Sequence, residues 1–315
     1  MRYGFGVDVG GTTVKLGFFS EVGDLIEKWE IPTNITDEGR QILPDIAAAI
    51  ADCLARSGVA SAQVLGIGIG VPGPVNDEGV INRCVNLGWG VFNLEQTLQS
   101  LTGLPVKAGN DANLAALGEV WKGGGMGSQH TLLVTLGTGV GGGLVLNGKI
   151  VAGSHGVAGE IGHITVNPSE TACCTCGKKG CVEQYASATG IVHLAKRYLS
   201  EHLQPSALRD MGDFSCKDVF SCAAQGDQLA QAALNQAYDY LGMAIADACC
   251  IFDPGLVLLG GGVSKAGQVL LDGVTARFRA HMFHASKDTR LALATLGNDA
   301  GIYGGFRLAL SEFGS

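Results

Sequence analysis

Two glycine-centred turns between apolar strands constrain the fold of this chain more than any other feature. The segments YGFGVDVGGTTVKLGFF (3–19) and HTLLVTLGTGVGGGLVLNGKI (130–150) each have the pattern of two strands joined by a tight turn. Glycine makes up 49 of the 315 residues, and it gathers at the ends of apolar runs without a collagen-like period. Two hairpins of one design predict a chain with two related halves.

Helices and strands alternate along the rest of the chain. Apolar spacing predicts helices over 42–58, 93–103, 188–203 and 227–252, strands over 64–75, 105–110 and 255–264, and a helix that starts at Asp111 or Asn113. This alternation predicts an α/β fold with mixed sheets covered by helices on both faces. We expect a smaller domain of residues 1–117, closed by a C-terminal helix at 300–315, and a larger domain of residues 118–299.

Charge and hydropathy exclude several classes of partner. The formal net charge is -8 and the pI is near 5.3, with no cluster of lysine and arginine that would suit a nucleic-acid backbone. The first residues lack the pattern of a secretory signal. The apolar runs VLGIGIGV and LVLLGGGV are too short and too rich in glycine to cross a bilayer. We therefore expect a cytoplasmic protein with no nucleic-acid and no membrane partner.

The turn DVGGTT (8–13) has the composition of a phosphate-binding turn. Because glycine lacks a Cβ atom, backbone N–H groups and the hydroxyls of Thr12 and Thr13 can close on a phosphate, and Asp8 would face its metal ion. The alternative is an ordinary tight hairpin with an aspartate on its strand. The turn by itself favours the ordinary hairpin.

Two further glycine-rich segments favour the phosphate interpretation. LGTGVGGG (136–143) places Thr138 between two glycines at another strand-to-strand turn, and LGGGVS (259–264) follows a predicted strand. None of the three fits the lysine-bearing P-loop or the dinucleotide fingerprint, which needs a following helix.

A candidate general base stands in the segment GNDAN (109–113). Asp111 lies where a strand is expected to end and a helix to begin, beside asparagines that can hydrogen-bond a polyol. Phosphoryl transfer to a hydroxyl needs a carboxylate of this kind to accept the proton. Aspartate is equally favoured at this position as a helix N-cap, so both roles remain open from the motif alone.

The motifs taken in order resemble those of a known family. DVGGTTVK, GVPGPV, NLGW, NDANLAALGE, TLGTGVGGG, GEIGHITV, CTCGKKGCVE and LGGGVS follow one another at appropriate distances over essentially the whole chain. Each motif is weak by itself, but the ordered set resembles the ROK family of sugar kinases and related repressors. The resemblance implies a two-lobed, actin-like ATPase (ribonuclease H-like) fold that binds ATP with Mg²⁺ from opposite lobes.

The resemblance also implies roles for individual residues. Asp111 would be the catalytic base, with Asn110 contacting the sugar. The further sugar contacts would be Gly73, Asn86, Glu160, His163 and Glu183. The residues that bind the nucleotide would be Asp8, Gly10, Gly11, Thr12, Thr13, Lys15, Gly137, Thr138 and Gly139, with Gly260, Gly261 and Gly262 flanking the adenosine. An isolated glutamate without this resemblance would be interpreted as a solvated or capping residue.

The segment CCTCGKKGC (173–181) holds four of the ten cysteines. In a reducing compartment, such spacing is more typical of a metal site than of a disulfide or a redox switch. Cys174, Cys176 and Cys181 would supply three thiolates to a structural Zn²⁺. Cys173 is a possible fourth ligand, but adjacent residues rarely aim both side chains at one metal. His163, which the family pattern also has, is the better candidate.

The resemblance implies an ATP-dependent kinase that phosphorylates the 6-hydroxyl of glucose. Alternatives within the family are kinases for N-acetylmannosamine, N-acetylglucosamine, fructose or allose, and a sugar-sensing regulator without kinase activity. The regulators carry an added N-terminal DNA-binding domain, whereas the first phosphate turn here begins at Asp8. Because family members are often dimers or tetramers, we expect a homo-oligomer whose small-molecule partners are a sugar and ATP.

Overall fold

A computed structural model describes residues 1–314, which form two compact units. Unit 1 comprises residues 1–129, 143–159 and 296–314, and unit 2 comprises 130–142 and 160–295. The predicted division between residues 117 and 118 falls inside helix α3 (Asp111–Lys122), and as a division into domains it stays a prediction.

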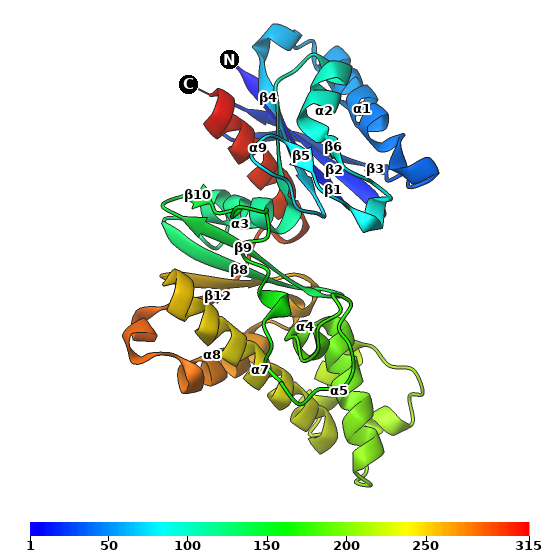
Figure 1. Cartoon of the computed structure of the whole chain (residues 1–315), viewed down its shortest axis with the longest axis vertical. Helices are drawn as coiled ribbons and strands as arrows, with labels where there is room; N and C mark the ends of the chain where they lie inside the picture. Colours follow the sequence, from blue (N-terminus) through cyan, green and yellow to red (C-terminus); the bar gives the residue numbers. More distant parts are fainter. Residues whose placement is uncertain (315) are drawn as a thin grey trace. The chain divides into compact units, whose positions relative to one another are not determined.

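Unit 1 is built on a five-stranded mixed sheet with the order β3-β2-β1-β4-β7. The strands are β1 (Tyr3–Val9), β2 (Thr13–Ser20), β3 (Leu25–Pro32), β4 (Val64–Val71) and β7 (Val106–Asn110). The hairpin β1-β2 is antiparallel, whereas β1, β4 and β7 run parallel. Helices α1 (Ile42–Ser57) and α2 (Leu94–Thr102) cover one face, where their apolar side chains share a core with Phe5, Val7 and Ile67. Helix α9 (Ala300–Phe313) covers the other face (Figure 1).

Glycines on the sheet allow α9 to approach it closely. Gly6 on β1 and Gly68 on β4 are register partners, and a Cβ atom on either would overlap a backbone carbonyl oxygen of α9, from Ile302 and Gly305 respectively. The residues that alternate with these glycines, such as Phe5 and Val7, point into the core on the opposite face. The glycines of YGFGVDV and VLGIGIGV therefore serve helix-to-sheet packing.

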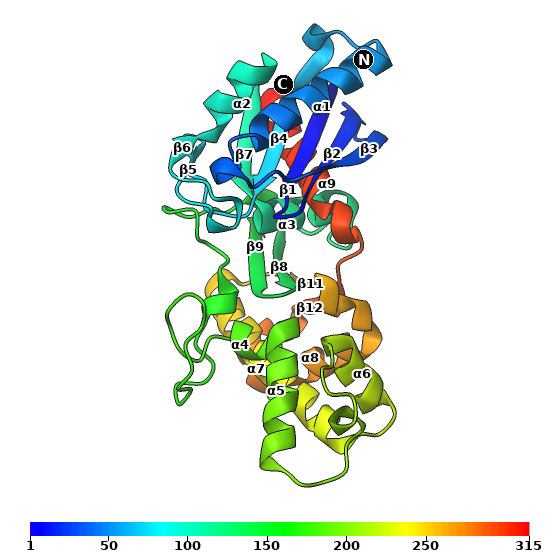
Figure 2. The same ribbon diagram turned by 90° about the vertical axis from the view of Figure 1, so that its right-hand side faces the viewer.

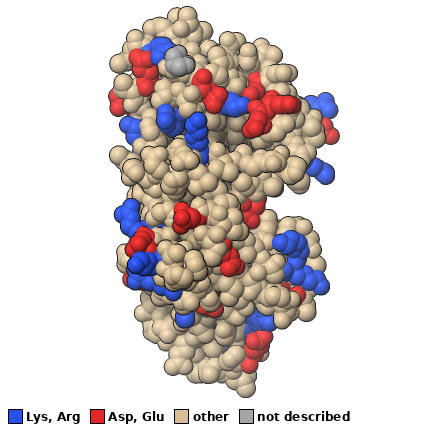
Figure 3. Space-filling view, turned by 60° about the vertical axis from the view of Figure 1, so that its left-hand side comes forward, with Lys and Arg blue, Asp and Glu red and all other residues tan. Residues whose placement is uncertain are grey.

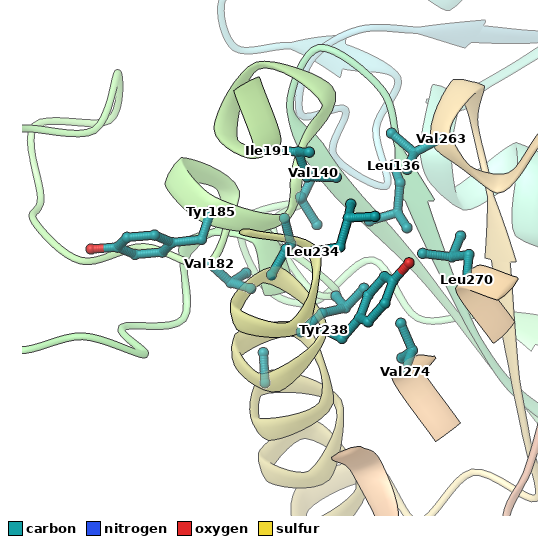
Figure 4. Packing of buried hydrophobic residues seen from close by; sticks show 14 of the residues in the cluster. Leu136, Val140, Val182, Tyr185, Ile191, Leu234, Tyr238, Val263, Leu270 and Val274 are labelled. Carbon is teal, nitrogen blue, oxygen red and sulfur yellow. The ribbon is translucent and has the colours of Figure 1, made fainter. Parts of the chain in front are cut away.

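Unit 2 contains most of a second five-stranded sheet, with the order β10-β9-β8-β11-β12. The strands of this sheet are β8 (His130–Leu136), β9 (Val140–Leu146), β10 (Lys149–Ile150), β11 (Leu256–Gly260) and β12 (Arg290–Leu293). The helices of unit 2 are α4 (Glu183–Ala186), α5 (Ala188–Glu201), α6 (Cys216–Ala224), α7 (Gln228–Phe252) and α8 (Gln268–His281). Figure 2 shows these helices from a second side. The core packs Leu136 and Val140 of the hairpin against Leu234 of α7 (Figure 4).

The predicted class is confirmed, since both units combine mixed sheets with helices. The predicted hairpins are β1-β2 and β8-β9. The helix expected to start at Asp111 or Asn113 is α3, and it starts at Asp111. Within residues 1–314, no helix combines the length and the apolar character needed to span a membrane. On the face shown in Figure 3, acidic and basic side chains are interspersed.

Candidate functional site

Two hydrogen bonds to backbone carbonyl oxygens support the turn between β1 and β2. The N–H of Gly10 donates to the carbonyl oxygen of Thr13 at 3.0 Å, and the Thr33 hydroxyl donates to the carbonyl oxygen of Gly10 at 2.7 Å. A Cβ atom on Gly11 would meet no atom within 4 Å, and Gly11 has no positive φ. Neither packing nor backbone conformation therefore requires glycine at this position. A glycine that leaves its space empty is compatible with a turn whose backbone approaches a ligand.

Asp8 lies at the end of β1, directly opposite Lys15 in the β1-β2 register. Burial raises the pKa of the Asp8 carboxyl above its usual value, and the charge of Lys15 opposes that rise. The carboxylate packs against the first turn of α9, where a Cβ atom on Gly301 would lie 2.6 Å from the Asp8 Cγ. A single carboxylate beside a candidate phosphate turn is compatible with Mg²⁺, which commonly takes one or two carboxylates together with substrate phosphates.

Asn110 and Asp111 divide the start of α3 between them. Asn110 is the N-cap, and its Oδ1 accepts the N–H groups of Ala112 at 3.0 Å and Asn113 at 3.2 Å. Asp111 is the first helical residue, and its Oδ1 accepts the Ala112 N–H at 2.8 Å. The N-cap role considered for Asp111 thus belongs to Asn110, and the half-buried Asp111 carboxylate is oriented at the positive end of the helix.

Two loops of unit 1 converge near this helix start. The Asn110 side chain lies 3.5 Å from the carbonyl oxygen of Gly73, and the Cys84 thiol donates to the carbonyl oxygen of Pro72 at 3.0 Å. Burial raises the pKa of Cys84, and the negative charge of Asp111 adds to the rise. Asn86 is exposed on the short helix Val85–Leu87 that follows. The structure therefore groups Gly73, Asn110 and Asp111, with the Asn86 loop joined to them through Cys84.

The turn between β8 and β9 carries the second candidate phosphate site. The N–H of Gly137 donates to the carbonyl oxygen of Gly139 at 2.9 Å, and Thr138 is exposed between them. A Cβ atom on Gly137 would meet nothing within 4 Å. This turn therefore also leaves open space around a glycine whose backbone conformation does not require it.

The glycine run at the end of β11 packs beside that turn. Gly261 has a φ of +81°, and a Cβ atom there would lie 2.6 Å from the carbonyl oxygen of Leu136, the residue before Gly137. Gly262, in contrast, faces open space. Two of the three glycines at 260–262 therefore differ: the backbone conformation and packing require Gly261, whereas a side chain at Gly262 would meet open space.

The predicted metal ligands form one cluster in unit 2. Ligand atoms of His163, Cys174, Cys176 and Cys181 all lie within 4.8 Å of one another. The Cys174 sulfur is 3.9 Å from the His163 Nδ1, and the sulfurs of Cys176 and Cys181 are 3.7 Å apart. A zinc tetrahedron with Zn–S bonds of about 2.3 Å has edges of about 3.8 Å, so this donor set fits the ion. All ten cysteines are free thiols, and Cys173 lies outside the cluster.

The segment 173–181, called the thiol loop below, is shaped by glycines and backbone hydrogen bonds. Gly177 and Gly180 have φ values of +86° and +74°, and the Cys174 N–H donates to the carbonyl oxygen of Lys178 at 2.7 Å. Burial together with the neighbouring thiols raises the pKa of Cys181 to about 12. Burial opposes ionisation of Cys176 as well, but hydrogen bonds from Lys178 and the other thiols lower its pKa below the usual value.

Glu160, His163 and Glu183 occupy three different positions in unit 2. Glu160 is exposed and precedes the short helix Ile161–His163, and His163 is half-buried at the end of that helix. Glu183 begins α4, and its Oε2 accepts the Val140 N–H at 3.1 Å. The structure therefore joins His163 to the thiol loop, and it joins Glu183 to both that loop and the β8-β9 hairpin.

Several residues of these sites were not singled out by sequence reasoning. Thr33 supports the first turn, Gly301 makes room for Asp8, and Thr175 donates a hydrogen bond to Glu183 at 3.2 Å. The position of Thr175 between two expected ligands was a usable signal. Thr33 and Gly301 gave none, because their contacts are with segments distant in sequence.

Comparisons with known proteins cover almost the whole chain. The model of the ROK family matches residues 4–312. A glucokinase of Halalkalibacterium halodurans is 47% identical over 309 residues, which cover 96% of this chain and 94% of the relative.

Solved structures match with similar coverage. A ROK family glucokinase from Streptomyces griseus, in complex with glucose and AMPPNP, is 33% identical with a TM-score of 0.77, covering 98% of this chain and 99% of that one. A ROK hexokinase from Thermus thermophilus is 31% identical with a TM-score of 0.84, covering 99% of each chain.

Proposed function

Since this chain belongs to the ROK family, we propose that it is an ATP-dependent glucokinase that phosphorylates the 6-hydroxyl of glucose. A glucokinase relative at 47% identity and a related structure with glucose and AMPPNP support this choice of sugar and nucleotide. The observation that carries the proposal is that Asn110, and not Asp111, is the N-cap at the start of α3. Because Asn110 is the N-cap, the helix does not need Asp111 in that position, which supports the proposed role of its carboxylate as a base.

Asp111 is the general base in this proposal. The oxygen of the glucose 6-hydroxyl forms a new bond to the γ-phosphorus, the bond from that phosphorus to the ADP oxygen breaks, and the hydroxyl proton passes to the Asp111 carboxylate. The Ala112 N–H holds one oxygen of that carboxylate in place. The residues proposed from the family resemblance as sugar contacts are Gly73, Asn86, Asn110, Glu160, His163 and Glu183.

The glycine turns are the proposed nucleotide contacts. Backbone N–H groups at Gly10, Gly11, Gly137 and Gly139, with hydroxyls of Thr12, Thr13 and Thr138, would stabilise the phosphate charge that develops during transfer. Asp8 would hold the Mg²⁺ that accompanies ATP, and Lys15 would offset the buried negative charge opposite it. Gly260, Gly261 and Gly262 would lie along the adenosine.

His163, Cys174, Cys176 and Cys181 would hold a structural Zn²⁺. Coordination through Nδ1 would fix the imidazole ring and leave Nε2 able to donate a hydrogen bond to a sugar hydroxyl. The ion would therefore shape the sugar pocket without taking part in phosphoryl transfer. A cytoplasmic location and a homo-oligomeric assembly stay predictions.

The proposal is tested by incubating the protein with Mg-ATP and a panel of hexoses while ADP release is followed. The panel contains glucose, fructose, allose, N-acetylglucosamine and N-acetylmannosamine. We expect the highest kcat/KM with glucose. A higher value for another sugar would reassign the substrate, and sugar binding without ADP release would indicate a sensor instead of a kinase.

A further inference from the structure

The carboxylate of Glu183 contacts two segments that are far apart in the sequence. Its Oε2 accepts the Val140 N–H at 3.1 Å, and its Oε1 accepts the Thr175 hydroxyl at 3.2 Å. Val140 directly follows the 137–139 turn, whereas Thr175 belongs to the thiol loop. One side chain therefore joins a candidate phosphate turn to the candidate metal loop.

Gly139 is shaped around this side chain. A Cβ atom on Gly139 would overlap the Glu183 Oε2, whereas a Cβ atom on Gly137 would meet nothing within 4 Å. Neither glycine has a positive φ. The two glycines of one turn thus have separate purposes: Gly137 leaves open space for a ligand, and Gly139 admits the Glu183 carboxylate.

The hydrogen bond between Glu183 and Val140 joins two backbone segments that are both fixed by packing. Val140 and Val182 point into the same hydrophobic core, where they are 3% and 0% exposed (Figure 4). The thiol loop lies mostly outside that core, and several of its residues are exposed. The Val140 end of the bridge is therefore held by the core, whereas the Thr175 end belongs to the more exposed loop.

Thr175 is the loop donor whose contact is compatible with metal binding. The Cys174 thiol also lies 3.5 Å from the Glu183 Oε1. A metal-bound cysteine is a thiolate, which has no proton to donate to a carboxylate. The Thr175 hydroxyl can keep donating in either state, so it is the group that orients the carboxylate when the metal is bound.

We infer that Glu183, oriented by Thr175, couples metal binding in the thiol loop to nucleotide binding at the 137–139 turn. Thr175 and Gly139 act here as positioning residues. The inference rests on the proposed function, because it takes this turn as part of the ATP site. Such coupling is reciprocal: zinc should tighten nucleotide binding by the same factor by which nucleotide tightens zinc binding.

The first test measures AMPPNP affinity of the zinc-loaded full chain by calorimetry. Thr175→Val removes the hydroxyl with little change of shape, and we expect affinity to fall about three- to tenfold, the effect of one hydrogen bond. Thr175→Ser keeps the hydroxyl and should bind like the wild type. Each variant should retain about one zinc per chain, because no ligand is altered.

The second test asks whether the effects share one route. Gly139→Ala displaces the same carboxylate, so adding Thr175→Val to it should weaken AMPPNP no further. Adding Thr175→Val to Gly137→Ala, the matched control in the same turn, should give additive losses. Zinc affinity, measured by chelator competition with and without AMPPNP, should show linkage in the wild type and none in Gly139→Ala.

Wild-type AMPPNP affinity in zinc-loaded Thr175→Val would overturn the inference while leaving the proposed function intact. Should Thr175→Val lose zinc, Gly139→Ala decides, because its change lies outside the thiol loop. Undiminished linkage between zinc and AMPPNP in that variant would then overturn the inference. A wild-type protein that binds no AMPPNP would instead refute the proposed function itself.

Discussion

The turns of the two hairpins have the same local design and different supports. In the first, the Thr33 hydroxyl, from the segment just after β3, donates to the carbonyl oxygen of Gly10 at 2.7 Å. In the second, the Val140 N–H donates to the Glu183 carboxylate, which begins α4 and also contacts the thiol loop. Local sequence produces the turn in both cases. The residue that hydrogen-bonds each turn, Thr33 or Glu183, determines which other part of the protein can affect it. Only the second turn should respond to metal.

The largest expected effect comes from Asp111, the proposed proton acceptor that neither turn can replace. Asp111→Asn keeps the shape of the side chain but lowers its basicity, so kcat should fall about 10²- to 10⁴-fold with little change in glucose affinity. Asp227→Asn is the control, since Asp227 caps α7 by accepting the N–H groups of Leu229 and Ala230. That control should keep its kcat. Wild-type turnover in Asp111→Asn would contradict the mechanism.

Metal removal is the next largest effect and should act on unit 2. We expect the wild type to hold about one zinc per chain, since a closed tetrahedral site needs all four ligands. The zinc content should fall in each of four variants: His163→Ala, Cys174→Ser, Cys176→Ser and Cys181→Ser. The KM for glucose should rise in parallel. Cys173→Ser should retain zinc and activity, because its thiol lies outside the cluster. Metal analysis that found zinc lost from Cys173→Ser and kept in His163→Ala would reject this ligand set.

Alanine at Gly11 and Gly137, the glycines that face open space, tests whether both turns bind the ATP phosphates. In Gly11→Ala and Gly137→Ala the added Cβ meets no protein atom within 4 Å, so the fold should be kept. The methyl group would occupy space proposed for phosphate, and the KM for ATP should rise about tenfold, as expected for loss of a charged hydrogen bond. Steady-state kinetics should show an unchanged KM for glucose.

Gly90→Ala is the matched control for these two variants. Gly90 also lacks a positive φ and faces open space, but it lies outside the phosphate turns. Its KM for ATP should equal that of the wild type. An equal rise in all three variants would count against the assignment of the two turns.

The smallest effect should come from the support of the first turn. Thr33→Val removes one neutral hydrogen bond, which contributes about 0.5–1.5 kcal/mol, so the KM for ATP should rise only a few-fold. Thr33→Ser should restore it. The ratio of Thr33→Val to wild-type AMPPNP affinity should be the same before and after chelation. If this affinity ratio changed on chelation, the first turn would also respond to zinc, which would contradict the proposed difference between the two turns.

Sequence patterns predicted the regular elements where a single segment contains the whole signal. The hairpins and the long helix α7 are of this kind. Strand β3 was not predicted, although its residues alternate between half-buried and exposed, because charged residues interrupt its apolar pattern. The four-residue edge strand β12 is too short to show a period. Its pairing with β11 depends on a neighbour more than thirty residues earlier.

The candidate site divides in the same way. The spacing of Cys174, Cys176 and Cys181 within one loop was visible directly, and the position of His163 came from a family resemblance. Sequence reasoning offered Asp111 as a base or as a cap, and the structure assigns the cap to Asn110. That choice depends on backbone angles and side-chain rotamers at a helix start, which the identities of the residues do not specify.

The sequence by itself determined the turn glycines, the ligand spacing and the order of the elements, because covalent geometry controls distances within a short segment. Only the tertiary structure decided which partner each of these features meets. Gly6 and Gly68 look like ordinary strand glycines until α9 packs on them. Glu183 appears to be a lone sugar ligand until α4 brings it to Val140. Contacts between distant segments depend on the path of the whole chain, and no local pattern encodes that path.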